Sequence, residues 1–209
     1  MFENLSESEI IKVEEKLGRV LINSIAREGI AEGLLDLDGL GANDAKRKAL
    51  DYARDYVNND GGITHSVLEH KDTLLEEARG YFKAERIELS IVLYGTWWEH
   101  WLNGIVKQRV TKQGLNENDF KEIVRSLNNK AKTSWLFKLL NLSPLAPEHL
   151  KVMALLTEKR NQFIHYKYPA NKWEDREILP NQFFETLEKS ISYFEHYEET
   201  NIYSSFSIE

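Results

Sequence analysis

The sequence predicts an all-α protein built as a helical bundle. Proline and glycine are scarce, four and eleven among 209 residues, which argues against a β-sandwich or barrel that needs a turn about every ten residues. The long segments between them carry apolar residues at helical spacing, and no segment shows the alternation typical of a strand. Hydrophobic residues form 42% of the chain, which is enough to build a packed core.

The composition predicts a soluble, cytoplasmic protein. No apolar run is long enough to span a bilayer, and the start MFENLSESEIIKVEEKLG has neither the basic region nor the apolar block of a targeting peptide. The absence of cysteine excludes disulfides, thiolate nucleophiles, cysteine-based zinc fingers and iron–sulfur sites. The net charge of −7 argues against sequence-blind adhesion to nucleic acid, although a local basic face is still compatible with it.

Residues 1–60 are predicted to form an N-terminal helical extension. Ser6 begins a capping box, and the apolar spacing that follows predicts a helix over about 6–28. A glycine-rich connector, GIAEGLLDLDGLGAND, leads to Asn43, which is a suitable N-cap for a second helix. The break NNDGG at 58–62 separates this extension from the rest of the chain.

Residues 63–200 are predicted to form the bundle itself. The proline-free segment 72–112 is apolar at helical spacing, and it forms either one long helix or two helices joined near Gly80. Its tryptophans are expected to lie in the core or in a dimer interface. A short amphipathic helix through Leu127 follows, and then come a basic turn, NNKAK, and the apolar segment WLFKLLNL.

Prolines mark the last two helices. Pro147 suits the first position of a helix that stops before Pro169, because a residue preceding proline disfavours the helical conformation. Pro180 precedes a final amphipathic helix, and residues 201–209 are predicted to be a frayed tail.

Arg160 and His165 are the candidate catalytic pair. They stand five apart in RNQFIH, at the end of the helix that begins at Pro147. They converge on one cleft only if the helix loosens or ends between them, as Pro169 favours. Arginine offers a rigid cationic fork for a phosphate, and histidine transfers a proton near neutral pH. These two groups are the minimum needed to cleave RNA through its own 2′-hydroxyl.

This segment resembles the HEPN superfamily, helical bundles that include many metal-independent endoribonucleases. The family motif is an arginine, four to six residues and a histidine, and the residue after the arginine is commonly Asn, Asp or His, as Asn161 is. An earlier long helix often carries an acidic residue in an aromatic setting, and Glu99 in YGTWWEHWLNG matches that description. The resemblance covers about 72–200, and of the ten arginines only Arg160 satisfies the spacing.

The resemblance implies an up-down bundle and a role for each motif residue. His165 would be the general acid–base, and Arg160 would stabilise charge on the phosphoryl oxygens. Asn161 would orient Arg160 or a phosphate oxygen, although an amide that bonds the backbone at a helix end explains it equally well. Glu99 would hold Arg160, unless it is an ordinary surface carboxylate paired with a lysine.

Two lysines beside the motif, Lys159 and Lys167, are the candidate RNA-binding residues. The segment from Lys121 to Lys172 holds ten Lys and Arg against three Asp and Glu, which makes it the most basic part of an acidic chain. Some toxin members place a tyrosine two residues after the histidine. In this chain Lys167 has that position and Tyr166 and Tyr168 flank it, so no role is carried over to either tyrosine.

The resemblance also implies partners and a biological setting. HEPN nucleases build a composite site from two copies, so a homodimer is expected, with the helix ending at His165 and the aromatic long helix at its interface. A toxin or phage-defence effector that cuts RNA is the implied function, with an antitoxin or regulatory protein as a further partner. No membrane partner and no cofactor are implied.

Simpler interpretations stay open. Arg160 can pair with Glu158, and His165 can cap its helix. The chain would then be a non-catalytic HEPN-like module that binds a protein or RNA, or a plain helical adaptor. No metal site is predicted, because His65 and His70, with Glu69 between them, are spaced five apart and do not share a helix face. Motifs for nucleotide hydrolysis, dinucleotide binding and zinc proteolysis are absent from the sequence.

Overall fold

The computed structural model describes residues 7–59, 71–164 and 181–203, and the regular secondary structure in these ranges is helical, with no strand. The predicted all-α fold is confirmed. None of the helices in these ranges is long and apolar enough to cross a membrane. The helices, in chain order, are α1 (Glu7–Glu32), α2 (Ala42–Asn59), α3 (Lys71–Lys83), α4 (Ile87–Lys112), α5 (Glu117–Ser126), α6 (Asn129–Ala131), the π-helical turn η1 (Lys132–Leu136), α7 (Phe137–Leu139), α8 (Pro147–Ile164) and α9 (Asn181–Asn201).

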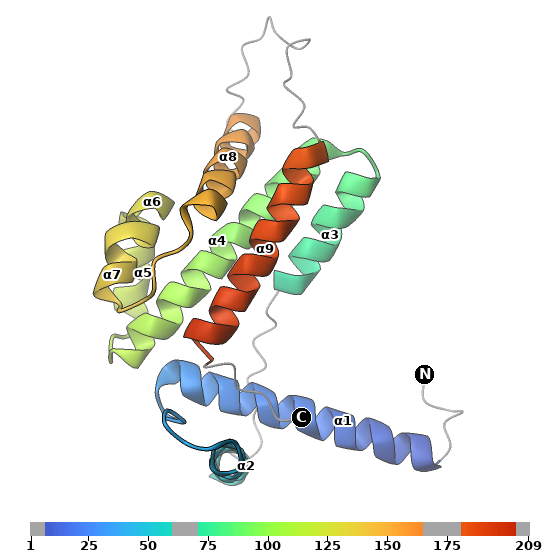
Figure 1. The fold of residues 1–209 in the computed structure, drawn as a ribbon, viewed down its shortest axis with the longest axis vertical. Coiled ribbons are helices and arrows are strands. Elements are labelled where there is room, and N and C mark those ends of the chain that lie inside the picture. Colours follow the sequence, from blue (N-terminus) through green and yellow to red (C-terminus); the bar gives the residue numbers. More distant parts are fainter. Residues whose placement is uncertain (1–6, 60–70, 165–180, 204–209) are drawn as a thin grey trace, which may run out of the picture.

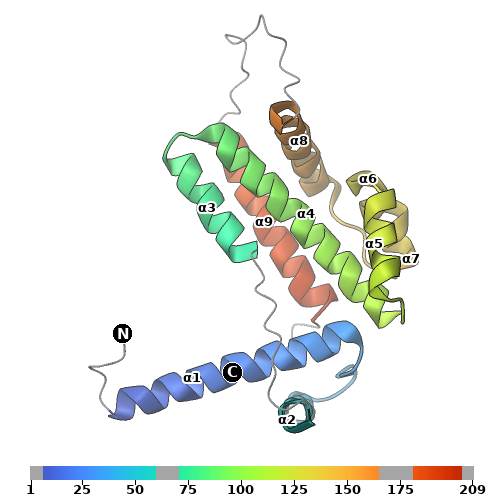
Figure 2. The same ribbon diagram turned by 180° about the vertical axis from the view of Figure 1, so that it is seen from behind.

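Helix α4 is the centre of the bundle. Helices α3 and α9 lie along one side of it and α8 along another, and the short helices α5 to α7 pack against its C-terminal half (Figure 1). Helix α1 runs across the end of the bundle where α4 terminates, with α2 packed beneath it (Figure 2). The N-terminal extension is therefore a helical pair laid across the base of the bundle.

Large aromatic rings join α4 to α9. Trp97, Trp98 and Trp101 are all buried. Trp98 stacks on Trp101 with ring centroids 5.4 Å apart, and the Phe194 ring lies 4.8 Å from each of them. The tryptophans are thus core residues of this chain, and their burial leaves no face for a base or a second subunit. Other apolar residues of α9 are also buried, namely Phe183, Phe184, Leu187 and Ile191.

The segment 72–112 contains two helices, and they join at a different place from the predicted one. Gly80 lies inside α3, and the break falls at Glu85, whose φ is 58°. The N–H of Arg86 donates to the carbonyl of Tyr81 across this turn, which ends α3 in a left-handed cap. Glycine is the usual residue at that position, so the glutamate there did not indicate a helix end in the sequence.

The basic segment NNKAK, predicted as a turn, is helical. Asn128 accepts a hydrogen bond from the N–H of Ala131 and so caps α6, which continues directly into η1 and α7. Lys132, at the start of η1, turns into the protein and donates to Asn103 of α4. The prediction of a turn was wrong because this stabilising contact comes from another helix.

The N-terminal extension has a small core of its own. Ala26, Ile30, Leu35 and Ala49 form a buried cluster separate from that of the bundle. Helix α1 was predicted to end at residue 28, before Gly29, but it continues to Glu32. Gly29 is a packing position inside the helix and does not end it. A Cβ at Gly29 would lie 2.5 Å from the Tyr52 ring, so the missing side chain makes room for α2.

The C-terminal prediction needs a correction. The frayed tail was expected from residue 201, but Asn201 ends α9, and Ile202 and Tyr203 are buried. The Tyr203 hydroxyl accepts a hydrogen bond from Gln108 at 2.8 Å, and the Arg27 guanidinium lies 4.1 Å above its ring. These contacts hold the end of α9 to both α1 and α4. Residues 204–209 lie outside the described residues.

A charged network joins α3, α4 and α9. Arg79 grips both carboxylate oxygens of Glu188, at 3.0 and 2.7 Å, and the buried Tyr94 hydroxyl donates to the same carboxylate at 2.5 Å. Burial by itself raises the pKa of Glu188, but the hydrogen bonds from Arg79 and Tyr94 outweigh it and leave the pKa below its ordinary value. The ionised carboxylate is therefore favoured in the folded state.

This network predicts a loss of stability in acid. A carboxylate whose pKa is lower in the folded state stabilises the fold above its unfolded pKa, about 4.3 for glutamate, and the contribution disappears as the pH falls through the folded pKa. Urea unfolding at pH 7 and at successively lower pH should show this loss, and Glu188→Gln should flatten it. Glu185→Gln, an exposed position on the same helix, is the control and should retain the wild-type pH dependence.

Candidate functional site

Arg160 lies near the C-terminal end of α8 and rests on the backbone of α4. A Cβ at Gly95 would lie 2.5 Å from Cδ of Arg160 and 3.4 Å from its Cβ and Cγ. The side chain therefore occupies the space that any other residue at position 95 would fill. Glycine lowers the stability of a helix interior, so its presence in the middle of α4 is explained by this close approach.

Glu99, one turn further along α4, holds the guanidinium. Nη1 of Arg160 donates to Oε1 of Glu99 at 2.6 Å, and the two side chains are 17% and 37% exposed. Nε of Arg160 is buried and has no hydrogen-bond partner among the described residues. The guanidinium is thus anchored on Glu99 through one nitrogen.

A second cation, from η1, packs against the next turn of α4. Lys132 of η1 is only 4% exposed, and its Nζ donates to Oδ1 of Asn103 at 2.8 Å. Burial lowers the pKa of Lys132, and the negative charge of Glu99 opposes that shift. Gly95, Glu99 and Asn103 follow one another at intervals of four residues, so they form a single row on α4. Along this row Glu99 is paired with Arg160 and acts electrostatically on Lys132.

The structure places some of the sequence-predicted site residues and not others. Arg160 and Glu99 are brought together, and Lys159 and Asn161 are partly buried beside Arg160 on α8. His165 and Lys167 lie outside the described residues, as do Tyr166, Tyr168 and the group His65, Glu69 and His70. No three potential metal ligands gather anywhere in the ranges that the structure describes.

Sequence reasoning missed Gly95, Asn103 and Lys132. The signal for the first two was a row of small or polar residues, four apart, in a helix that is otherwise rich in large apolar residues. Nothing in the sequence shows that Lys132 reaches this row, since its partner lies 29 positions away on another helix.

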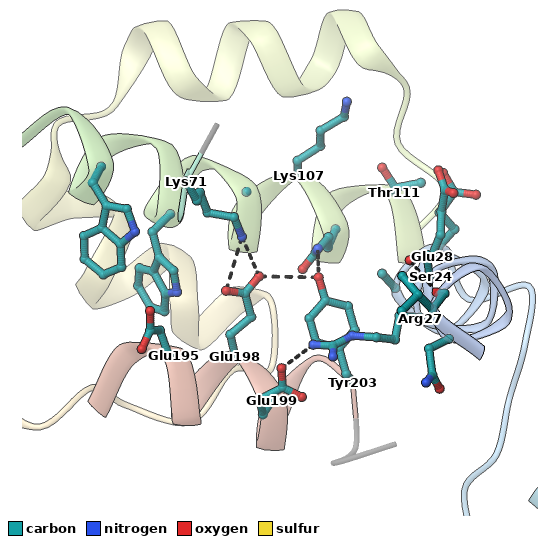
Figure 3. A pocket seen from close by; sticks show the side chains of 18 residues that line it. Ser24, Arg27, Glu28, Lys71, Lys107, Thr111, Glu195, Glu198, Glu199 and Tyr203 are labelled. Carbon is teal, nitrogen blue, oxygen red and sulfur yellow. Dashed lines mark hydrogen bonds and ion pairs between the residues drawn. The ribbon is translucent and has the colours of Figure 1, made fainter. Parts of the chain in front are cut away.

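A second polar site lies where α1 crosses the bundle. A cavity of about 930 Å³ is lined by residues of α1, α4 and α9 and by Lys71 (Figure 3). Its charged groups bind one another: Lys71 donates to Glu198 at 3.0 Å, and Arg27 pairs with Glu199. None of the Arg160, Glu99, Lys132 and Asn103 side chains lines this cavity. The pair of Arg27 and Glu199 ties the extension to the bundle, and the pair of Lys71 and Glu198 joins α3 to α9.

No protein-family model, curated protein or solved structure matches this chain.

Proposed function

We propose that this chain is a metal-independent endoribonuclease of HEPN type. The observation that carries the proposal is the arrangement of Arg160 near the end of α8, where it is seated on Gly95 and oriented by Glu99. In the sequence, Arg160 stands five residues before His165. A preorganised cation is what stabilisation of a developing phosphoryl charge requires, because no reorganisation is then needed as the reaction proceeds.

The proposed reaction uses the 2′-hydroxyl of the RNA as the nucleophile. The 2′-oxygen attacks the adjacent phosphorus, the bond from phosphorus to the 5′-oxygen breaks, and the products are a 2′,3′-cyclic phosphate and a 5′-hydroxyl. His165 transfers the protons as general acid–base. Arg160 stabilises the charge on the non-bridging oxygens, and Asn161 orients Arg160 or a phosphate oxygen. Lys159 and Lys167 contact the strand on either side.

We further propose that the active form is a homodimer. One chain supplies one Arg160 and one His165, and a composite site needs the two motifs to face each other across one groove. The end of α8 is the expected meeting point. The buried tryptophans of α4 are committed to the core of their own chain, so an α4 contribution to the interface must come from its other side chains. A toxin or phage-defence role, with an antitoxin or regulatory partner, is part of the same proposal.

The second candidate is a non-catalytic helical module that binds a protein or RNA. The contact between Arg160 and Glu99 is also compatible with this candidate. An ion pair that joins α8 to α4 is a sufficient structural role for both residues. The two candidates differ in one measurable property, the cleavage of RNA.

The test is incubation of the purified chain with single-stranded RNA in excess EDTA. Cleavage to 2′,3′-cyclic phosphate products is expected, since none of the proposed steps uses a metal. Single-stranded DNA and 2′-O-methyl RNA of the same sequence should stay intact, because neither has a free 2′-hydroxyl. A requirement for Mg²⁺, or equal attack on DNA, would contradict the nuclease proposal and leave the non-catalytic module.

Gly95→Ala tests whether RNA cleavage depends on the position of the Arg160 side chain, because this variant keeps Arg160 but moves it. The new Cβ would displace the Arg160 side chain from Glu99. A misplacement of about 1 Å in a catalytic group can cost 10²-fold, so RNA cleavage should fall by about 10- to 100-fold. The free energy of unfolding should not fall in proportion to the loss of activity, because alanine is more favourable than glycine inside a helix by about 1 kcal/mol.

Gly104→Ala on the same helix is the matched control. No heavy atom lies within 4 Å of a Cβ at Gly104, so this variant should cleave RNA at the wild-type rate. Equal activity of the two variants would show that the contact between Gly95 and Arg160 has no part in the reaction.

A further inference from the structure

The turn formed by η1 and α7 exposes large apolar side chains. Trp135 is 48% exposed and Leu139 is 64% exposed. The other tryptophans of the described residues, Trp97, Trp98 and Trp101, are buried. Because Trp135 and Leu139 are four residues apart, they lie side by side on one helical face. An exposed tryptophan beside an exposed leucine forms an apolar patch of the kind found at interaction surfaces.

The π-helical turn explains why Trp135 points outward. Lys132 and Leu136 of the same turn are buried at 4% and 5% exposure, and Lys132 is anchored on Asn103. Trp135 and its neighbour Ser134 therefore take the outer face of the turn. A π-turn has weaker backbone geometry than an α-helix and occurs frequently at functional sites.

The segment that carries Trp135 is basic. No Asp or Glu occurs between Glu122 and Glu148 in the sequence, although the whole chain carries a net charge of −7. Lys130 and Lys138 are exposed on this segment, and neither has a carboxylate partner among the described residues. We define the Trp135 surface as Lys130, Ser134, Trp135, Lys138 and Leu139.

Polar groups and the candidate active site lie close to this surface. A groove of about 590 Å³ beside it is lined in part by Ser134 and Lys138 and by the amide of Asn141. On its inner side, Lys132 contacts Asn103, which is one turn from Glu99 on α4. The same short turn is thus anchored beside the Arg160 and Glu99 pair and carries an exposed ring with cations on its outer face.

We propose that the Trp135 surface binds single-stranded RNA, with a base stacked on Trp135 and the phosphates contacting Lys130 and Lys138. This inference rests on the proposed function and adds a path for the strand outside the site of cleavage. An exposed aromatic ring among unpaired lysines suits a polyanion with accessible base faces. A duplex keeps its base faces covered, and a protein partner that covers one tryptophan and one leucine gains nothing from the lysines.

The test measures the affinity of the full chain for a 2′-O-methyl oligonucleotide of about 12 nucleotides, which spans a typical single-strand site. This strand cannot be cleaved, so binding is read independently of activity. Trp135→Ala should weaken binding by about 5- to 150-fold, the range for loss of one stacked base. Trp135→Phe should retain most of the affinity. Leu34→Ala, at a 67% exposed leucine outside the Trp135 surface, should leave it unchanged.

Salt dependence tests the lysines. Lys130→Gln and Lys138→Gln should each reduce the slope of log affinity against log salt by about 0.7, as expected for one lost phosphate contact on a single strand. A duplex of the same sequence should bind equally to the wild type and to Trp135→Ala.

The outcomes separate this inference from the proposed function. Unchanged affinity in Trp135→Ala, or equal losses in the alanine and phenylalanine variants, would overturn the stacking role even if the chain cleaves RNA. Sedimentation showing that Trp135→Ala dissociates a dimer, with RNA affinity unchanged, would assign the surface to a second copy of this chain instead. Trp135-dependent binding without any cleavage in EDTA would uphold this surface and contradict the nuclease.

Discussion

His165→Ala is expected to lower RNA cleavage by about 10²- to 10⁴-fold, the usual cost of losing a positioned general acid–base. Single-turnover cleavage of a labelled RNA in EDTA measures this change directly. His196→Ala, which removes an exposed histidine from α9, is the control and should retain full activity. Survival of cleavage in His165→Ala would contradict the proposed mechanism.

Arg160→Ala belongs to the same prediction and should cost about 10²- to 10³-fold, as the loss of one transition-state donor does. Arg160→Lys should restore little, because a lysine presents a point charge where the arginine presents a planar fork. Circular dichroism should show that both variants keep the helical content of the wild type. If lysine restores full activity, position 160 supplies only charge, and its orientation by Glu99 is irrelevant to the reaction.

Trp98→Ala is expected to lower the free energy of unfolding by about 3–5 kcal/mol, the usual cost of truncating a buried tryptophan. Trp98 is 2% exposed, stacks on Trp101 and contacts the Phe194 ring, so its loss opens a cavity between α4 and α9. Urea unfolding followed by circular dichroism measures the change.

Trp135→Ala is the matched control for the core prediction. It removes the same side chain from a position that is 48% exposed, so the free energy of unfolding should fall by clearly less than in Trp98→Ala. Similar losses in the two variants would mean that the aromatic cluster between α4 and α9 does not dominate the stability of the bundle.

Much of the helical architecture follows from local signals that a sequence displays. Pro147 is the first residue of α8, as its fixed φ and missing N–H predict, and the apolar positions of α9 are the buried ones. The break after α3 could not be predicted in this way. A glutamate in the left-handed conformation at position 85 is disfavoured locally, and it is held by the hydrogen bond from Arg86 to Tyr81 and by the packing of α3 against α4.

The candidate site also has a part that the sequence predicts and a part that only the packing of helices decides. Arg160, His165, Asn161 and Glu99 came from residue types, spacing and a family resemblance, and those features cannot say whether two side chains touch. The contact of Arg160 with Glu99, which lies 61 positions earlier in the chain, depends on α8 lying against α4 at the height of Gly95. Lys132 was missed for the same reason.

By itself, the sequence determined that this chain is all-α, because helical periodicity, capping residues and the positions of proline act within a few residues of one another. Only the tertiary structure decided which polar side chains share a site and which tryptophan of the described residues stays exposed. Those outcomes depend on contacts between helices far apart in the chain, where the close approach of Arg160 to Gly95 and the burial of Lys132 against Asn103 outweigh local preference.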